Sequence, residues 1–125
     1  MTGSESTPLS VGVPSRTAHL DTFVRDHLPP AADWPLLRFD LLPELARYPA
    51  RLNCAVELLD RQAVADAARP ALRQAGGSVS YGELLDRSQR IAAVLVEDLG
   101  LVPGNRVLLR GFNGPLLVAA WLAVQ

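Results

Sequence analysis

The stretch from Ser80 to Gln125 constrains the fold more than any other part of the chain, because it joins two helical patterns through a turn and a short apolar run. Ser80 and Glu83 have the S-x-x-E spacing of a capping box, in which each side chain accepts a hydrogen bond from the other residue's backbone N–H. Gly100 is expected to end this helix, because glycine adopts a left-handed φ without steric cost. The order helix, strand, helix predicts the start of a βαβ layer, and therefore an α/β fold.

The helix predicted over 80–99 has one apolar face and one charged face. Its apolar residues recur at the 3.6-residue spacing of an amphipathic helix and are Tyr81, Leu84, Leu85, Ile91, Ala92, Leu95 and Leu99. Acidic and basic side chains four residues apart predict two ion pairs on the other face, Glu83–Arg87 and Asp86–Arg90.

The segment after this helix predicts a turn, a buried strand and a second helix. Pro103-Gly104-Asn105 forms the turn, and Arg106–Arg110 contains three consecutive apolar residues, which is typical of a strand buried on both faces. Asn113 is the expected N-cap of an apolar helix over Pro115–Gln125. That helix is too short to span a bilayer, so we expect it in a protein core.

The first half of the chain predicts a tail, a short helix and an irregular connector. Residues 1–17 are expected to be a disordered tail, with one partial domain over 18–125. Ala18–Leu28 predicts an amphipathic helix that buries Leu20, Phe23, Val24 and Leu28. The connector 31–49 contains Trp34, Phe39, Leu41, Leu42 and Tyr48, which we expect to be buried on a larger body.

The middle of the chain predicts a helix followed by a hairpin. Asn53 is the expected N-cap of a helix to Asp66, with Ala55, Val56, Leu59 and Ala63 buried and Glu57 paired with Arg61. Strands at 70–73 and 78–80 are expected to flank a glycine turn at 74–77.

Composition excludes several classes of function. Twelve basic and thirteen acidic residues give a net charge of −1, which offers no electrostatic attraction for nucleic acid or an anionic membrane. The N-terminus lacks the basic-then-apolar pattern of a signal peptide, so we expect a cytoplasmic protein. Cys54 is the one cysteine and is expected to be a buried apolar residue, with no base to activate it.

No catalytic, cofactor-binding or metal-ligating residue is assigned from the sequence. Gly111–Gly114 precedes a helix and could bind an anion, but it lacks a phosphate-loop spacing and the chain has no lysine, which favours a plain turn. His19 and His27 have no partner at metal-ligand spacing. The acidic pairs Glu97/Asp98 and Asp21/Asp26 are interpreted as solvated helix faces.

Several segments, taken in order, resemble the N-terminal part of the adenylate-forming superfamily. They are 80–84 (SYGEL), 100–107 (GLVPGNRV), Asn113 and the apolar 119–125. The superfamily succession is TYxEL…GxxxGDRV…N…AxLAxxKAG, from which Asn105 departs, because an aspartate is common there. Upstream, 19–23 (HLDTF), 28–30 (LPP), 34–35 (WP), 52–55 (LNCA) and 58–61 (LLDR) resemble the aryl branch, the benzoate and 2-aminobenzoate CoA ligases.

The resemblance implies a parent enzyme that uses ATP and Mg²⁺ to convert an aromatic acid to an acyl-adenylate, then transfers the acyl group to CoA. We expect the chain to be truncated at Gln125, inactive alone and without bound cofactor, with the rest of the polypeptide covering its last helix. Two alternatives stay open: a small interaction or oligomerisation protein that uses 115–125, and an adenylating enzyme for a fatty or amino acid.

Overall fold

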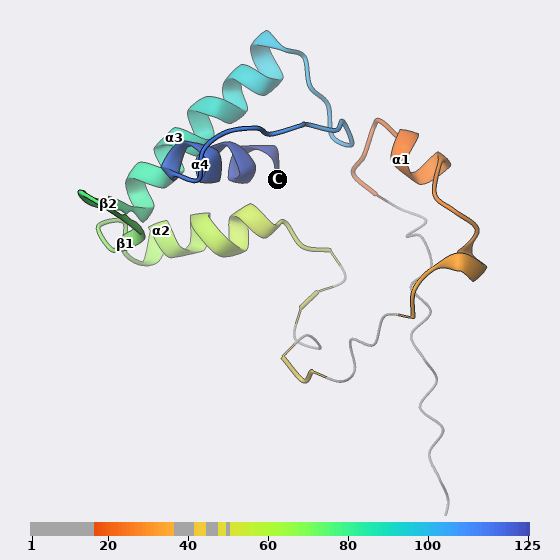
Figure 1. The fold of residues 1–125 in the computed structure, drawn as a ribbon, viewed down its shortest axis with the longest axis horizontal. Helices are drawn as coiled ribbons and strands as arrows, with labels where there is room; N and C mark the ends of the chain where they lie inside the picture. The colour runs from red at the N-terminus through yellow and green to blue at the C-terminus, as the bar shows by residue number, and fades with distance from the viewer. Residues whose placement is uncertain (1–16, 37–41, 45–47, 50) are drawn as a thin grey trace, which may run out of the picture.

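The computed structural model describes residues 17–36, 42–44, 48–49 and 51–125 (Figure 1). Residues 1–16 of the tail predicted over 1–17, and Phe39 and Leu41 of the connector, lie outside the described residues. The regular elements are α1 (Phe23–Asp26), a 3₁₀ turn (Ala31–Asp33), a π-helical segment (Val56–Asp60), α2 (Arg61–Ala65), β1 (Pro70–Gln74), β2 (Gly77–Ser80), α3 (Tyr81–Ala93), a second π-helical segment (Val94–Asp98) and α4 (Pro115–Val124). This mixture of helices and a small sheet agrees with the expected α/β class.

The capping box at the start of α3 is confirmed. The Ser80 backbone N–H donates to Glu83 Oε2 at 2.8 Å, and the Glu83 backbone N–H donates to Ser80 Oγ at 3.2 Å. Because the Glu83 carboxylate is bonded at Ser80, the predicted Glu83–Arg87 ion pair is not formed. The predicted Asp86–Arg90 pair is formed, at 3.0 Å.

The far end of the α3 helix departs from the expected apolar face. Gly100 ends the helix with φ +65°, as predicted. Before it, the Leu99 backbone N–H donates to Val94 O, five residues earlier, as in a π-helix. The extra residue in this turn changes the direction of the side chains that follow. Leu99 is therefore 63% exposed, and its predicted burial is wrong.

The hairpin is confirmed. Strands β1 and β2 are antiparallel, and Gln74 pairs with Gly77 across the turn. Gly76 has φ +93°, a value that glycine adopts readily. The hairpin leads directly into α3, which begins at the residue after β2. At this junction the Tyr81 backbone N–H donates to Arg69 O at 3.0 Å.

The core lies where the helix ending in α2, the hairpin and α4 all meet α3 (Figure 1). It consists of Leu59, Val79, Leu84, Ala119 and Leu122. The predicted N-cap Asn53 accepts a hydrogen bond from the Val56 backbone N–H at 3.0 Å, and the predicted Glu57–Arg61 pair is formed at 2.7 Å. Val56, which was expected to be buried, is exposed.

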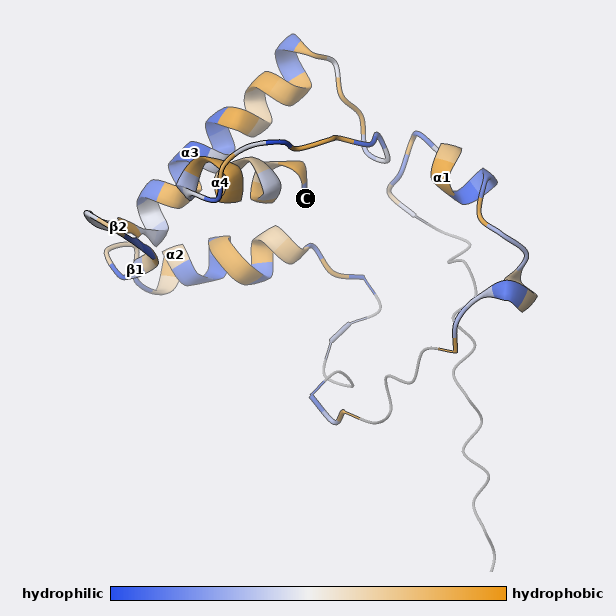
Figure 2. Cartoon of the chain, viewed as in Figure 1, coloured by the Kyte–Doolittle hydropathy of each residue, from blue (hydrophilic) through white to orange (hydrophobic). Residues whose placement is uncertain are grey.

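Helix α4 forms as predicted but begins differently. Gly114 is its N-cap, in extended backbone, and Pro115 is its first residue, where a missing N–H costs no helical hydrogen bond. The prediction that Asn113 caps this helix is therefore wrong. Figure 2 shows that apolar residues dominate α4, but only Ala119 and Leu122 are fully buried.

Residues 106–110, predicted as a strand, pair with no other strand in the described part of the chain. None of their backbone N–H groups donates to a described backbone carbonyl. Leu108 is 93% exposed, whereas a strand in the middle of a parallel sheet would bury it on both faces. The predicted burial is therefore wrong for Leu108, while Val107 and Leu109 are half-buried. The predicted strand does not form among the described residues, because a strand requires a neighbour to pair with.

The N-terminal helix is shorter than predicted, because α1 covers only Phe23–Asp26. Residues 18–21 instead lie along the turn after α3, where the backbone N–H groups of Leu20 and Asp21 donate to Pro103 O. All four side chains predicted to be buried by this helix are exposed. Leu42 and Tyr48 of the connector are also exposed, while Trp34 is half-buried and donates its indole N–H to Pro29 O at 2.8 Å.

Replacing Leu59 by alanine tests the position of the core. Leu59 is 1% exposed, so Leu59→Ala is expected to lower the free energy of unfolding by about 2–5 kcal/mol. The adjacent Leu58 is 55% exposed, and Leu58→Ala is expected to cost less than about 1 kcal/mol. Urea unfolding of the two variants measures both values, and equal losses would contradict this core.

The capping box predicts a pH dependence of stability. Its hydrogen bonds, first from the Ser80 backbone N–H and then from the Ser80 hydroxyl, lower the pKa of Glu83 from its ordinary value of 4.5. The stabilisation is therefore complete above pH 4.5 and is lost as the pH falls through the lowered pKa. Thermal melts of Glu83→Gln should show a smaller loss of stability on acidification than the parent chain. Glu97→Gln, whose exposed side chain makes no hydrogen bond to a described residue, should keep the parent pH profile.

Candidate functional site

The glycine loop before α4 was the one candidate anion site, and its geometry does not suit a phosphate. Gly111 and Gly114 both lack a positive φ, and a Cβ on either would meet only ordinary contacts. Neither glycine is therefore needed for a tight turn or for close approach of a ligand. The first residue of α4 is Pro115, which has no N–H to offer an anion.

The hollow beside this loop is apolar. It has a volume of about 600 Å³ and is lined mainly by Leu108, Leu109, Phe112, Leu116 and Leu117. Phe112 is 99% exposed and Leu116 is 71% exposed. Arg110 is the one charged residue in its lining, and the other lining residues are mostly apolar.

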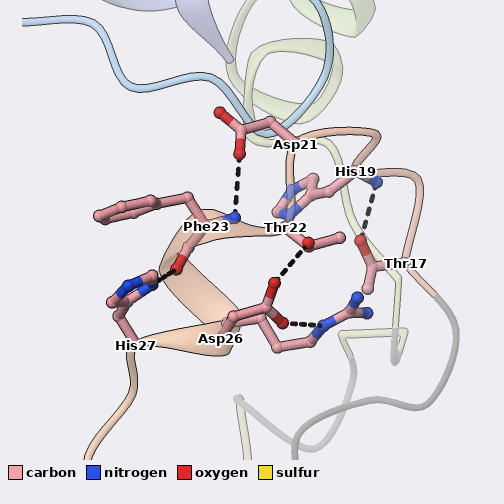
Figure 3. Close-up of polar contacts among 8 residues, drawn as sticks. Thr17, His19, Asp21, Thr22, Phe23, Asp26 and His27 are labelled. Carbon is pink, nitrogen blue, oxygen red and sulfur yellow. Dashed lines mark hydrogen bonds and ion pairs between the residues drawn. The ribbon is translucent and has the colours of Figure 1, made fainter.

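Metal ligands do not gather in the described part of the chain. No group of three His, Cys, Asp or Glu side chains there could hold a metal ion. His27 Nδ1 lies 2.7 Å from Phe23 O, so it carries the hydrogen that it donates to this carbonyl (Figure 3). The resemblance implies ATP and Mg²⁺ for the parent enzyme. Among the described residues, the loop before α4 has no glycine cradle for a phosphate, and no group of three side chains offers ligands for Mg²⁺. In the same region, no helix is long and apolar enough to cross a membrane.

Cys54 is exposed, so its predicted burial is wrong. It lies in the first turn of the helix that Asn53 caps, one turn before the core residue Leu59. It also lines a hollow of about 580 Å³ together with His19, Arg51, Asn53 and Gly104. His19 lines this hollow, but its ring makes no hydrogen bond to the Cys54 thiol, and no lining side chain is a carboxylate, so the hollow does not define a nucleophilic site.

The polar cluster of greatest sequence separation joins the segment before α1 to the turn after α3. Asn105 Nδ2 donates to Asp21 Oδ2 at 2.8 Å, and Asp21 Oδ1 accepts from the Phe23 backbone N–H at 2.9 Å. The Phe23 N–H, then the Asn105 amide, Arg106 and His19, lower the pKa of the Asp21 carboxyl from its ordinary value of 3.8. Figure 3 shows Asp21 turned away from Asp26, which instead accepts from the Thr22 hydroxyl.

Sequence reasoning missed Asp21, which it interpreted as part of a solvated acidic face. One local signal was available, because an aspartate just before a helix commonly accepts a hydrogen bond from a backbone N–H of the first turn. The partner Asn105 lies 84 residues away, and no local pattern reveals that contact.

Comparison with known proteins shows the class of the chain. Residues 59–125 match the family model for the AMP-binding enzymes, and the chain belongs to this family. The matched region contains α2, the hairpin, α3 and α4, which together form most of the core.

One curated relative gives a more particular similarity. The chain is 46% identical over 65 residues to a salicyl-AMP ligase / salicyl-S-ArCP synthetase of Mycobacterium tuberculosis. The match covers 52% of this chain and 11% of the relative's length. No solved structure matches the chain significantly.

Exposure of Cys54 predicts that its thiol reacts in the native protein. A thiol reagent such as a maleimide should modify one site per native chain, at a rate within about tenfold of the unfolded chain, because no core packing shields the sulfur. Mass spectrometry at intervals after mixing measures this rate, and Cys54→Ser is the control for modification elsewhere. Protection of the native thiol by several orders of magnitude would contradict the exposed position.

Proposed function

We propose that this chain forms the N-terminal part of an AMP-forming ligase that activates an aromatic carboxylic acid and transfers it to a thiol. The match of residues 59–125 to the AMP-binding enzymes supports the ligase class. In the proposed reaction the carboxylate attacks ATP, giving an acyl-adenylate and pyrophosphate. A thiolate then attacks the acyl carbon, forms a thioester and releases AMP.

The aromatic acid is the finer part of this proposal. The relative's printed name specifies a salicyl group, and salicylate is a hydroxylated benzoate. The segments of this chain that resemble benzoate and 2-aminobenzoate CoA ligases favour the same class of acid. A fatty acid or an amino acid is the alternative substrate within the same reaction.

The acceptor is a separate choice. We propose CoA, following the resemblance to the CoA ligases, while the name of the relative gives S-ArCP as the product's thioester partner. Both are consistent with transfer of the acyl group to sulfur, so the thiol step is common to the two possibilities.

The exposed apolar residues before and in α4 form a surface that a larger enzyme could cover. Leu108, Phe112 and Leu116 are exposed side by side along the segment that ends in α4. Burial of each such side chain is worth about 1.5–3 kcal/mol. We propose that further residues of the same polypeptide cover this surface and supply the groups that bind ATP, Mg²⁺ and the thiol. A self-contained interaction protein that uses this surface for a partner is the alternative.

ATP–pyrophosphate exchange tests the proposed function. A longer polypeptide containing these residues should exchange labelled pyrophosphate into ATP with benzoate, 2-aminobenzoate or salicylate, and should form a thioester when CoA is added. Octanoate and phenylalanine are the comparison acids. The 125-residue chain alone, which lacks a fitting nucleotide site among its described residues, should give no exchange.

The possible outcomes separate the parts of the proposal. Exchange with octanoate or phenylalanine but with no aromatic acid would overturn the aromatic substrate and retain the ligase. Aromatic-dependent exchange without a CoA thioester would overturn CoA as the acceptor. Exchange with none of the acids would overturn the ligase proposal itself.

A further inference from the structure

Residues Thr17–Leu28, here called the strap, cross the turn Val102–Arg106 that follows α3 (Figure 1). The backbone N–H groups of Leu20 and Asp21 both donate to the Pro103 carbonyl oxygen, at 2.7 Å and 3.1 Å. A single carbonyl of the turn therefore holds two successive amides of the strap.

The side chains of Asp21 and Asn105 add a directional contact. Asn105 Oδ1 accepts from the Val102 backbone N–H at 2.9 Å, so its Nδ2 must face the strap. Asp21 Oδ1 accepts from the Phe23 backbone N–H, so Oδ2 faces the turn and accepts from Asn105 Nδ2 at 2.8 Å. Each side chain is thus oriented by a backbone N–H two or three residues away in its own segment, and this orientation suits the bond between them.

Two further contacts fit the strap to the turn. Gly104 has φ +101°, and a Cβ there would lie 2.2 Å from Asp21 O, which is far too close for two nonbonded atoms. The Arg106 guanidinium lies 3.8 Å from the centre of the Phe23 ring, a distance suited to a cation–π contact. The turn therefore fits the strap in two ways. Gly104 leaves room for the strap backbone, and the side chains of Asn105 and Arg106 bind Asp21 and Phe23.

Apolar burial contributes little to this attachment. Leu20 is 72% exposed, and Phe23, Val24 and Leu28 are also exposed. A segment with few buried apolar contacts opens locally at a lower free energy than the core. The polar contacts at the turn are therefore the main attachment of the strap.

We propose that the strap is a detachable element of this fold, and that the hydrogen bond between Asp21 and Asn105 controls its attachment to the turn. Detachment would remove Ala18 and His19 from the wall of the hollow that also contains Asn53, Cys54 and Gly104, and would widen the opening of that hollow. The device is independent of the proposed ligase activity.

Exchange of the two side-chain types provides the sharpest test. In Asn105→Asp, two carboxylates face each other. In Asp21→Asn, the new amide oxygen still accepts from the Phe23 backbone N–H, so the amide NH₂ faces the Nδ2 of Asn105, and neither group can accept a hydrogen bond. Either change should speed hydrogen exchange at the amides of Leu20 and Asp21 by about tenfold or more, because a hydrogen bond and its orientation are lost. The double variant Asp21→Asn with Asn105→Asp can keep the bonds from the Phe23 and Val102 backbone N–H groups, and reverses only the bond between the two side chains. It should recover to within about threefold of the parent.

NMR hydrogen exchange near neutral pH measures these rates, corrected for the intrinsic rate of each sequence. The amides of the buried α3 residues Leu84 and Ser88 report on the rest of the fold and should not change. Unchanged strap amides in both single variants, or a double variant no slower than the singles, would overturn the proposal.

A second pair of variants keeps the test decisive if a carboxylate variant does not fold. Gly104→Ala places a methyl group against Asp21 O, so it should release the strap amides and leave α3 protected. Gly76→Ala is the matched control, because Gly76 also has a positive φ of +93° but a Cβ there would meet no atom within 4 Å. Equal exchange of the strap amides in these two alanine variants would also overturn the proposal.

Discussion

The packing of α4 against α3 is the contact on which the described core depends. Ala119 is completely buried at this interface, and its small side chain allows the two helices to approach closely. Leu122 of α4 joins Leu84 of α3 and Leu59 in the same cluster. Without α4, the apolar face of α3 would lose its largest neighbour, and the hairpin would be left on a helix with little else to hold it.

This arrangement buries one side of α4 and leaves the segment before it uncovered. Residues 106–110 have the composition of a central parallel strand but no strand partner among the described residues. The adjoining apolar hollow continues from this segment into the first turn of α4. If further residues of the same polypeptide lie here, as we propose, they would both pair with 106–110 and cover the apolar hollow.

The parts of the fold that follow from local chemistry could be predicted from the sequence. The capping box of Ser80 and Glu83, the end of the helix at Gly100, the hairpin glycine and the Asp86–Arg90 pair each depend on residues within a few positions of one another. The family could also be predicted, because short motifs in the right order were present over 80–125, within the region that matches the family model.

The features that were missed depend on longer-range or irregular structure. The π-helical turn that exposes Leu99 leaves no clear pattern in the residue types, and the burial of 106–110 requires a partner that a local reading cannot supply. The role of Asp21 depends on Asn105, and an aspartate at position 105, as is common in the superfamily, would oppose the Asp21 carboxylate. The loop before α4 was the one anion site that the sequence offered, and its lack of a positive φ could be seen only in the structure.

Hydrogen exchange at the amides of Val107, Leu108 and Leu109 tests the central claim most directly. These amides should be unprotected in the 125-residue chain, because they donate to no described backbone carbonyl. In a longer polypeptide they should be protected by more than about a hundredfold, because a paired strand would then hold them. Equally fast exchange in both proteins would contradict the account that this segment is a strand completed by the rest of an AMP-binding enzyme.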